Sequence, residues 1–369
     1  RAEPTRDVFV REHARAAALE HEVGVLHWDP VLEPSCATGS RPVPLEDPRE
    51  TGGLRTWRIR QRVTRLPLSM LAQGAWALRR ALPNLWPDGR PPDLIHAHVF
   101  QAGALAALAT LGLRLPWVVT EHYSAVALGR LGRRDRLQAR LAYQGAGMVL
   151  PVSAALRAGV ERCAPGARCR VVPNPVDLER FRYVPRPPNE PRRLLFVGRL
   201  AEIKDLPLLL RGLARLRQRR DDWRLELVGD GPERARVEGL VAELALGGLV
   251  RVRGALPHAE VGAELARADL LVLTSQWENL PCVIAEAHVA GVPVVAREVG
   301  GVGEMLTPAT GVLFRERDPG ALADALDAAL DAPFERGEIA AQAAARYSLA
   351  AVGRALGEVY AEVLARQPG

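Results

Sequence analysis

Residues 193–204 read Arg193-Leu194-Leu195-Phe196-Val197-Gly198-Arg199-Leu200-Ala201-Glu202-Ile203-Lys204. The apolar run ends at Gly198, and a helical pattern follows from Asp205 to Leu216. This order of strand, loop and helix is typical of an α/β sheet, where ligands collect beyond the carboxyl ends of the strands. The loop carries two cations, Arg199 and Lys204, and we interpret them as ligands of a diphosphate.

Lys204 is the only lysine among the 49 lysine and arginine residues. Every other basic position of this kind is arginine, so the single lysine indicates that a compact ammonium is preferred here over a planar guanidinium. The alternative is an ordinary solvated lysine at the start of a helix.

The composition indicates a globular protein with two cores. The chain has 369 residues, 48% of them apolar and 25% charged, with a formal net charge of +6. That length predicts two domains. The longest apolar run, Ala102 to Leu113, is shorter than the ~18 residues of a membrane span, and we expect no signal peptide.

The cysteines show neither a metal-ligand spacing nor a dense disulfide framework, so we expect reduced thiols, no zinc and a cytoplasmic location. They are Cys36, Cys163, Cys169 and Cys282.

Continuous apolar runs alternate with helical patterns along the chain, which predicts parallel strands buried on both faces. The expected strands are Glu22–Trp28, Leu94–Ala97, Trp117–Thr120, Met148–Val152, Leu194–Val197, Leu225–Val228, Val250–Val252, Leu270–Thr274 and Val292–Ala296. The fold class is therefore α/β, with two doubly wound, Rossmann-like domains that we expect to face each other across a ligand cleft.

The proline-rich stretch Tyr183–Arg192 predicts an exposed connector. We place a first domain at residues 1–184 and a second at 190–345, and we expect a final helical segment at 346–369 to cross back to the first domain. A helical pattern from Val8 to Leu19 precedes the first expected strand, whereas a doubly wound domain normally opens with a strand. The opening strand of the first domain is thus expected to be missing.

Two glutamates follow the strand that ends near Thr274. Glu278 falls in the loop, and Glu286 falls in a helix that Pro281 starts, because proline is tolerated at a first helical position. The amides of that helix terminus favour an anion, and Glu286 could accept hydrogen bonds from ribose hydroxyls. Two surface carboxylates in salt bridges are the alternative.

The ordered motifs resemble glycosyltransferase family 4, the retaining enzymes of GT-B fold, over nearly the whole chain. They are Gly198-Arg199-Leu200 with Lys204, Val228-Gly229-Asp230-Gly231-Pro232, Val252-Arg253-Gly254, Glu278 with Glu286, Gly291-Val292-Pro293-Val294-Val295, Val299-Gly300-Gly301, Phe9-Val10-Arg11-Glu12-His13, Asp93-Leu94-Ile95-His96-Ala97-His98, Thr120-Glu121-His122 and Val172-Pro173-Asn174-Pro175-Val176-Asp177.

The resemblance implies a hexosyltransferase that uses a UDP- or GDP-sugar and a sugar, glycolipid or polysaccharide-precursor acceptor. Arg199 and Lys204, in the loop of Gly198, would hold the diphosphate, and Glu286 would bind the ribose. Glu278 would contact the reacting sugar, and the backbone at Gly254 would meet the base.

The first domain is implied to bind the acceptor, with His122 close to the donor sugar as a second catalytic residue. His98 would line the acceptor cleft, although a core histidine is an equal alternative, and Glu121 is placed among the substrate-binding residues. No metal and no cofactor are expected, since fixed positive charge can meet the developing anion of the leaving group.

One departure concerns the turn after Glu278, which is rich in glycine in many relatives but here contains Pro281. Proline lacks an amide hydrogen, so the anion contacts are expected from the neighbours Leu280, Cys282 and Val283.

We interpret a basic stretch near the start as a contact with an anionic membrane that carries a lipid-linked acceptor. Its arginines are Arg55, Arg58, Arg60, Arg62 and Arg65. A solvated basic strand edge is the alternative, and no nucleic acid is expected as a partner. Two further functions stay open, a sugar-nucleotide epimerase of the same fold and a non-catalytic binding scaffold.

Overall fold

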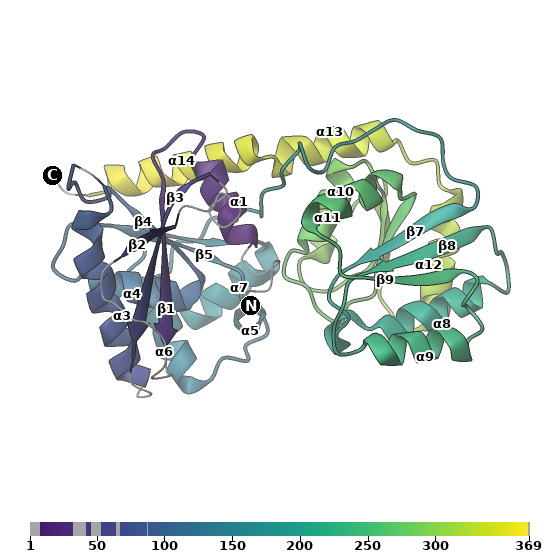
Figure 1. Cartoon of the computed structure of the whole chain (residues 1–369), viewed down its shortest axis with the longest axis horizontal. Helices are drawn as coiled ribbons and strands as arrows, with labels where there is room; N and C mark the ends of the chain where they lie inside the picture. Colours follow the sequence, from purple (N-terminus) through teal and green to yellow (C-terminus); the bar gives the residue numbers. More distant parts are fainter. Residues whose placement is uncertain (1–7, 32–41, 46–52, 64–66, 87, 368–369) are drawn as a thin grey trace. The chain divides into compact units, whose positions relative to one another are not determined.

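The computed structural model describes residues 8–31, 42–45, 53–63, 67–86 and 88–367. They form two compact units (Figure 1). The C-terminal unit comprises Pro175–Ala351, and the N-terminal unit combines the described residues of Asp7–Asn174 and Val352–Gly369.

The C-terminal unit is built on one six-stranded sheet in which every neighbouring pair of strands is parallel. The order across the sheet is β12-β11-β10-β7-β8-β9, so β7 and β10 are neighbours at the point where the order reverses. The strands are β7 (Arg192–Val197), β8 (Trp223–Val228), β9 (Val250–Gly254), β10 (Leu270–Leu273), β11 (Val294–Arg297) and β12 (Gly311–Phe314). This topology confirms the predicted doubly wound fold.

Helices cover both faces of this sheet (Figure 1), with α8, α9 and α12 on one side and α10, α11 and α13 on the other. Their bounds are α8 (Leu206–Leu216), α9 (Arg234–Glu243), α10 (His258–Arg267), α11 (Cys282–Val289), α12 (Pro319–Asp331) and α13 (Arg336–Tyr347), with 3-10 turns η2 (Glu202–Lys204) and η3 (Val302–Glu304). All four residues of β10 are buried, as expected for a strand covered on both faces.

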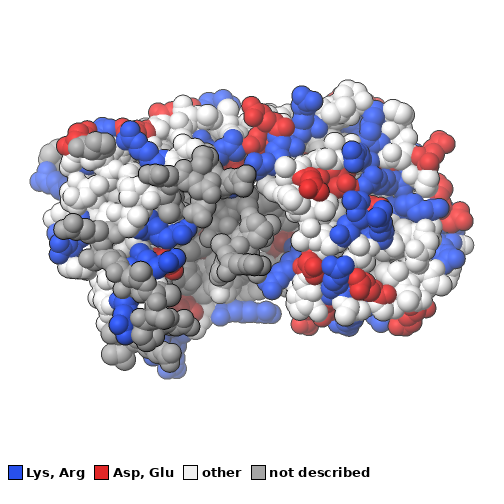
Figure 2. Space-filling view, in the orientation of Figure 1, with Lys and Arg blue, Asp and Glu red and all other residues white. Residues whose placement is uncertain are grey.

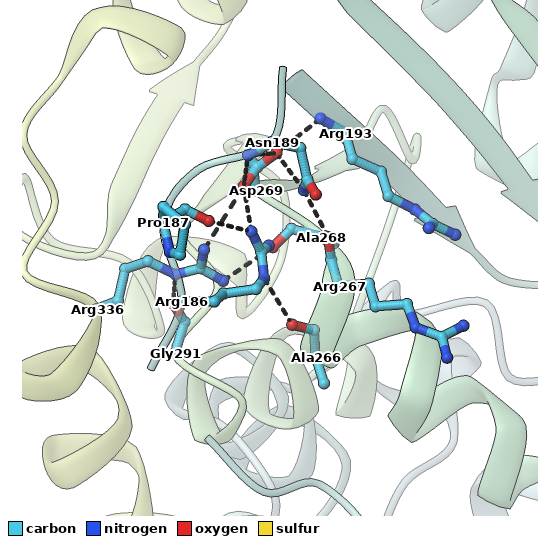
Figure 3. A network of polar contacts seen from close by, with 10 residues as sticks. All are labelled: Arg186, Pro187, Asn189, Arg193, Ala266, Arg267, Ala268, Asp269, Gly291 and Arg336. Carbon is cyan, nitrogen blue, oxygen red and sulfur yellow. Dashed lines mark hydrogen bonds and ion pairs between the residues drawn. The ribbon is translucent and has the colours of Figure 1, made fainter. Parts of the chain in front are cut away.

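The proline-rich stretch after Tyr183 is fastened to this unit by Asp269, which lies directly before β10 (Figure 3). The Asp269 carboxylate accepts hydrogen bonds from Arg186 Nη1 at 2.9 Å and from Asn189 Nδ2 at 2.7 Å. Arg336 adds an ion pair at 3.6 Å. The connector is exposed at its prolines, as predicted, but Arg186 and Asn189 are half-buried anchors.

The N-terminal unit contains two three-stranded sheets, with the orders β1-β3-β2 and β4-β5-β6. Its strands are β1 (Gly24–Val31), β2 (Val43–Leu45), β3 (Arg55–Arg62), β4 (Ile95–His98), β5 (Trp117–Glu121) and β6 (Met148–Pro151). Its helices are α1 (Val8–Ala17), α3 (Pro67–Ala81), α4 (Val99–Ala109), α5 (Ser124–Ala127), α6 (Arg133–Gln144) and α7 (Ala154–Cys163), with the 3-10 turn η1 (Leu82–Asn84). The last helix, α14 (Leu349–Ala365), lies in this unit from Val352 onward.

The edge strands β1 and β4 both line a cavity of about 770 Å³ within the N-terminal unit. Helices α1, α3, α4 and α14 complete its wall. Helix α14 packs closely on α1, because a Cβ at Gly353 would stand 2.5 Å from the carbonyl oxygen of Ala16. In the described part of the chain α1 comes before any strand, as the sequence predicts.

The basic stretch forms the middle strand of its sheet and is therefore not the strand edge that was considered above. β3 pairs in parallel with β1 and antiparallel with β2. Strand β12 was not predicted, because Gly311–Phe314 is a short apolar run.

Candidate active site

Two loops meet where the order of the C-terminal sheet reverses, and they bring a cation and a carboxylate together. Lys204 follows β7, and Glu278 follows β10. Lys204 Nζ lies 2.5 Å from Glu278 Oε1, and Ser275 Oγ donates a hydrogen bond to the same oxygen at 2.7 Å. Both side chains of the ion pair are mostly buried, with exposed fractions of 19% and 13%. The predicted loops therefore converge at the position where α/β sheets bind ligands.

The end of the Lys204 loop is fixed by hydrogen bonds from the loop after β10. Thr274 Oγ1 donates to the carbonyl oxygens of Lys204 at 2.9 Å and of Asp205 at 3.1 Å. Asp205 has a left-handed backbone with φ of 50°, and its buried carboxylate is paired with Arg317 at 2.5 Å. A non-glycine residue in this conformation is uncommon, and these bonds hold it in place.

Close backbone contacts between neighbouring strand ends require two of the motif glycines. Gly229 has a φ of +143°, and a Cβ there would lie 1.8 Å from the carbonyl oxygen of Gly198. Gly300, with a φ of +52°, would place a Cβ 1.9 Å from the carbonyl oxygen of Glu278. The glycines thus let the loops after β7 and β8, and those after β10 and β11, approach each other in pairs, which positions the Gly198 loop and Glu278.

Glu286 lies on α11, 12% exposed, and its carboxylate is held by a histidine that the sequence analysis missed. His258 Nε2 lies 3.1 Å from Glu286 Oε1, and Arg180 Nη1 lies 2.9 Å from His258 Nδ1. Because a guanidinium can only donate, Nδ1 accepts, and Nε2 carries the hydrogen that is donated to Glu286. His258 therefore orients the carboxylate.

The other predicted donor-site residues surround these groups. Arg199 is exposed, and no side-chain partner of it is found among the described residues. Leu280 is buried, while Cys282 and Val283 are half-buried at the start of α11. The N-cap residue of this helix, Pro281, makes no capping hydrogen bond with its side chain. Gly254 has a φ of +77° and accepts a hydrogen bond from Gly229 N at 2.8 Å. Arg199 is thus the more accessible of the two predicted cations.

The N-terminal unit gathers histidines at the carboxyl ends of β4 and β5. His98 Nδ1 lies 3.3 Å from His122 Nε2, and the ring of His13 lies 5.4 Å from that of His98 and 5.5 Å from that of His122. Burial lowers the pKa of all three imidazoles, that of His13 to about 4. They are therefore neutral at pH 7.

Glu121, which was predicted as a substrate-binding residue, is fully buried. Its two oxygens accept hydrogen bonds from the amides of Phe100, His122 and Tyr123, at 2.9, 2.9 and 2.8 Å, and from Tyr143 Oη at 2.5 Å. Burial raises the pKa of Glu121, and these bonds offset part of the change. The carboxylate therefore fixes the loops after β4 and β5 and is a positioning group.

The arginines of β3 are partly neutralised within their own unit. Arg55 pairs with Glu22 at 3.0 Å and Arg60 pairs with Asp29 at 3.1 Å, whereas Arg62 is exposed. Arg65 lies outside the described residues.

Figure 2 shows acidic and basic side chains interspersed on the visible face of the C-terminal unit. None of the described helices is long and apolar enough to cross a bilayer.

Comparisons with known proteins agree with both halves of this description. The family described as "Glycosyl transferases group 1" matches residues 177–346, and "Glycosyltransferase Family 4" matches residues 7–180. The chain is 31% identical over 305 residues to D-inositol 3-phosphate glycosyltransferase of Thermobispora bispora, which covers 74% of this chain and 71% of that protein.

Two solved structures share the fold at low sequence identity. Sucrose-phosphate synthase from Thermosynechococcus elongatus superimposes with a TM-score of 0.76 at 23% identity, covering 98% of this chain and 94% of that one. HepE of Anabaena in complex with UDP-glucose has a TM-score of 0.68 at 19% identity, covering 92% and 99% of the two chains.

Proposed function

Because the chain belongs to glycosyltransferase family 4, we propose that it transfers a hexosyl group from a UDP- or GDP-sugar to a hydroxyl of a sugar-containing acceptor, with retention at the anomeric carbon. The observation that carries this proposal is the pairing of Lys204 with Glu278 at the reversal point of the C-terminal sheet. One loop there offers positive charge for a leaving diphosphate, and the adjacent loop offers an acceptor for sugar hydroxyls.

The diphosphate is assigned to Lys204, Arg199 and the start of α11. Lys204 has three donor hydrogens, so its contact with Glu278 leaves others for phosphate oxygens. The amides and dipole of a helix N-terminus favour the same anion. Together these groups stabilise the charge that develops on the leaving group, and we propose that donor binding therefore needs no metal.

The nucleoside is assigned to the other end of the same sheet edge. Glu286, oriented by His258, accepts hydrogen bonds from the ribose hydroxyls, and the backbone at Gly254 meets the base. HepE binds UDP-glucose, which makes UDP the first nucleotide to test.

The transfer itself breaks the bond between the anomeric carbon and the phosphate oxygen and forms a bond to the acceptor oxygen on the same face. The departing phosphate takes the proton of the acceptor hydroxyl. Glu278 positions the sugar and stabilises charge. We assign His122 to the transferred sugar and His98 to the acceptor.

The narrower proposal of a lipid-linked acceptor depends on the arginines of β3. Loss of binding to anionic vesicles in an Arg58/Arg60/Arg62→Ala variant supports it, and unchanged binding contradicts it.

Product analysis tests the reaction. The protein is incubated with UDP- and GDP-sugars, with and without simple glycoside acceptors, and products are followed by NMR. We expect a new glycoside whose anomeric configuration matches that of the donor. An inverted product, or a changed sugar nucleotide formed from donor alone, contradicts the proposal, and the second result indicates an epimerase.

A further inference from the structure

Helix α4 lies between α3 and α6 in the N-terminal unit (Figure 1). A Cβ at Gly103 of α4 would stand 2.8 Å from the Cβ of Ala142 on α6. Arg79, near the end of α3, donates hydrogen bonds to the carbonyl oxygens of Ala109 at 3.1 Å and of Leu111 at 2.7 Å. The three helices and the loop that follows α4 therefore form one layer, whose outer side we call the α3–α4–α6 face.

This layer carries most of the net charge of the chain. Its three helices contain six arginines and one aspartate, a net charge of +5, so the rest of the chain contributes only +1 to the formal net charge of +6. All seven side chains are exposed. They are Arg79, Arg80, Arg133, Arg134, Asp135, Arg136 and Arg140. Such a concentration of one sign attracts a surface of opposite charge.

The charge of these arginines is not neutralised within the molecule. None of the six forms an ion pair within the described part of the chain. On β3, by contrast, Arg55 is paired with Glu22 and Arg60 with Asp29. A carboxylate beside a guanidinium weakens its attraction for a second anion. The arginines of the α3–α4–α6 face therefore keep their charge for an external partner.

Large apolar side chains are exposed on the same layer. They are Trp76 on α3, Leu111 and Leu113 in the loop after α4, and Leu137 and Leu141 on α6. Leu111 is 65% exposed and Leu137 is 66% exposed. A single exposed leucine is ordinary, whereas apolar side chains gathered on one face mark an interaction site.

On α6 the exposed leucines lie among arginines. The buried side of this helix consists of Ala139, Ala142 and Tyr143. Leu137 and Leu141 are one turn apart on the other side. Three arginines lie three or four residues from Leu137, namely Arg133, Arg134 and Arg140. Leucines flanked by arginines are typical of helices that lie in the headgroup region of a bilayer, because the long arginine side chains reach the phosphates while the leucines enter the acyl region.

Helix α4 contains most of the longest apolar run of the chain, Ala102–Leu113. The helix has no charged residue, and Leu105 and Leu108 are only half-buried. An apolar run of this length is too short to span a bilayer and is typical of a buried helix or of an interfacial segment. Its position between two basic helices, with Leu111 exposed at its end, favours the interfacial segment.

We propose that the α3–α4–α6 face binds the surface of an anionic lipid bilayer, with its arginines among the lipid phosphates and its leucines and Trp76 at the border of the acyl chains. A nucleic acid would match the charge but would leave the leucines in water. A second copy of the chain would bring two faces of the same sign together, which is unfavourable. The inference is independent of the proposed transfer reaction, because it concerns binding to the bilayer alone.

The test uses the full chain and two kinds of vesicle, phosphatidylcholine alone and phosphatidylcholine with about 40% phosphatidylglycerol. Bound protein is measured by flotation at about 0.05 M and about 0.3 M salt. We expect binding to the anionic vesicles only, and we expect salt to reduce it without abolishing it, because the apolar contacts are not screened. Equal binding to both vesicles, or no binding to either, overturns the proposal.

Two variants of α6 locate the contact, and circular dichroism checks that both are folded. Each arginine near an anionic surface strengthens binding about fivefold, so Arg133→Gln/Arg134→Gln/Arg140→Gln should bind the anionic vesicles at least tenfold more weakly. Leu137→Ser/Leu141→Ser should lose the binding that persists at the higher salt concentration. Wild-type affinity in both variants contradicts the proposal.

The matched control removes the same charge from exposed positions of the C-terminal unit, in Arg211→Gln/Arg215→Gln/Arg251→Gln. It should bind like the wild type, and a loss equal to that of the α6 arginine variant would mean that net charge alone governs binding, which overturns the assignment.

Two further measurements separate this face from its rivals. The β3 variant Arg58/Arg60/Arg62→Ala is assayed on the same vesicles, and a loss confined to that variant overturns the assignment to the α3–α4–α6 face. Single-stranded RNA is titrated as well. Tighter binding of RNA than of the anionic vesicles, lost in the same α6 variants, would overturn the lipid proposal and reassign the face to a nucleic acid.

Discussion

The contribution of His258 to nucleotide binding can be measured separately from the contributions of the residues that bind the phosphates. His258 Nε2 donates a hydrogen bond to Glu286, and its Nδ1 accepts one from Arg180. We expect His258→Ala to weaken UDP binding about fivefold, which corresponds to ~1 kcal/mol for one lost hydrogen bond. Affinity for inorganic pyrophosphate, which has no ribose, should be unchanged. Calorimetry with both ligands checks this, and equal losses for both would mean that His258 acts on the whole site.

Adding a single carbon atom at Gly229 tests whether the ends of the neighbouring strands approach each other closely. A Cβ at Gly229 would stand 1.8 Å from a backbone oxygen of Gly198, which cannot move away as a flexible side chain could. We expect Gly229→Ala to lower the melting temperature and to abolish measurable nucleotide binding.

Gly239→Ala is the matched control for this change, since a Cβ there would have no neighbour within 4 Å. Gly239 lies inside α9, so alanine should raise stability by up to ~1 kcal/mol. If Gly229→Ala melted and bound nucleotide like the wild type, the tight packing described for the loops would be wrong.

At the scale of elements, Asp269 tests how the connector is fastened to the C-terminal sheet (Figure 3). Its side chain is 7% exposed and faces the guanidinium groups of Arg186 and Arg336. Removal of one partner from such a buried pair typically costs 3–5 kcal/mol. We expect Asp269→Ala to reduce the free energy of unfolding of the C-terminal unit by about 3 kcal/mol in urea denaturation. Replacement of the exposed Asp324 on α12 by alanine should change it by less than about 1 kcal/mol.

The elements of the C-terminal unit could be predicted closely because its strands are continuous apolar runs. Residues 270–273 form β10 within the predicted range 270–274, and the parallel arrangement then places Lys204 and Glu278 at the same sheet edge. His258 could not be predicted, because it lies 28 residues from Glu286 and its only local signal is a proline before a helix. The Asp269 network was missed for the same reason, since its partners come from distant parts of the chain.

The buried role of Glu121 was also beyond the sequence. A carboxylate beside a histidine in a motif suggests a substrate contact, whereas the four donors that hold it come from three separate segments. The middle position of β3 was obscured by its arginines, which are more typical of an exposed edge.

At the scale of the whole molecule, the two units should respond differently to acid. Burial lowers the pKa of His13 to about 4 and that of His96 to about 3, and it lowers the pKa values of His98 and His122 as well. A histidine with a lowered pKa in the folded state binds protons mainly after unfolding, so stability falls as the pH drops below about 6.5. Glu121, whose pKa is raised, acts in the opposite sense but is a single group.

Urea unfolding at pH 7.5, 6.0 and 5.0 measures this effect. We expect the N-terminal unit to lose stability first, with His13 alone contributing ~2 kcal/mol of the loss at pH 5. The His13→Asn variant should show a pH dependence that is flatter by that amount. A transition midpoint that stays constant or rises toward pH 5 would contradict the burial of neutral imidazoles.

Whether nucleotide binding requires a metal ion is a further property of the whole molecule. If Lys204, Arg199 and the start of α11 neutralise the diphosphate, affinity for the nucleotide should be the same in buffer with EDTA and in buffer with Mg²⁺. A dependence on Mg²⁺ would show that these groups do not suffice.

The central claim is that the loop of Lys204 binds the diphosphate of a nucleotide sugar. Its most direct test is a calorimetric titration of UDP and GDP into the wild type and into Lys204→Ala, with Arg211→Ala on the exposed side of α8 as the control. We predict micromolar binding of one nucleotide, a loss of at least tenfold, or ~1.4 kcal/mol, in Lys204→Ala, and no change in Arg211→Ala. Binding of neither nucleotide by the wild type, or equal affinity in the wild type and Lys204→Ala, would contradict the claim.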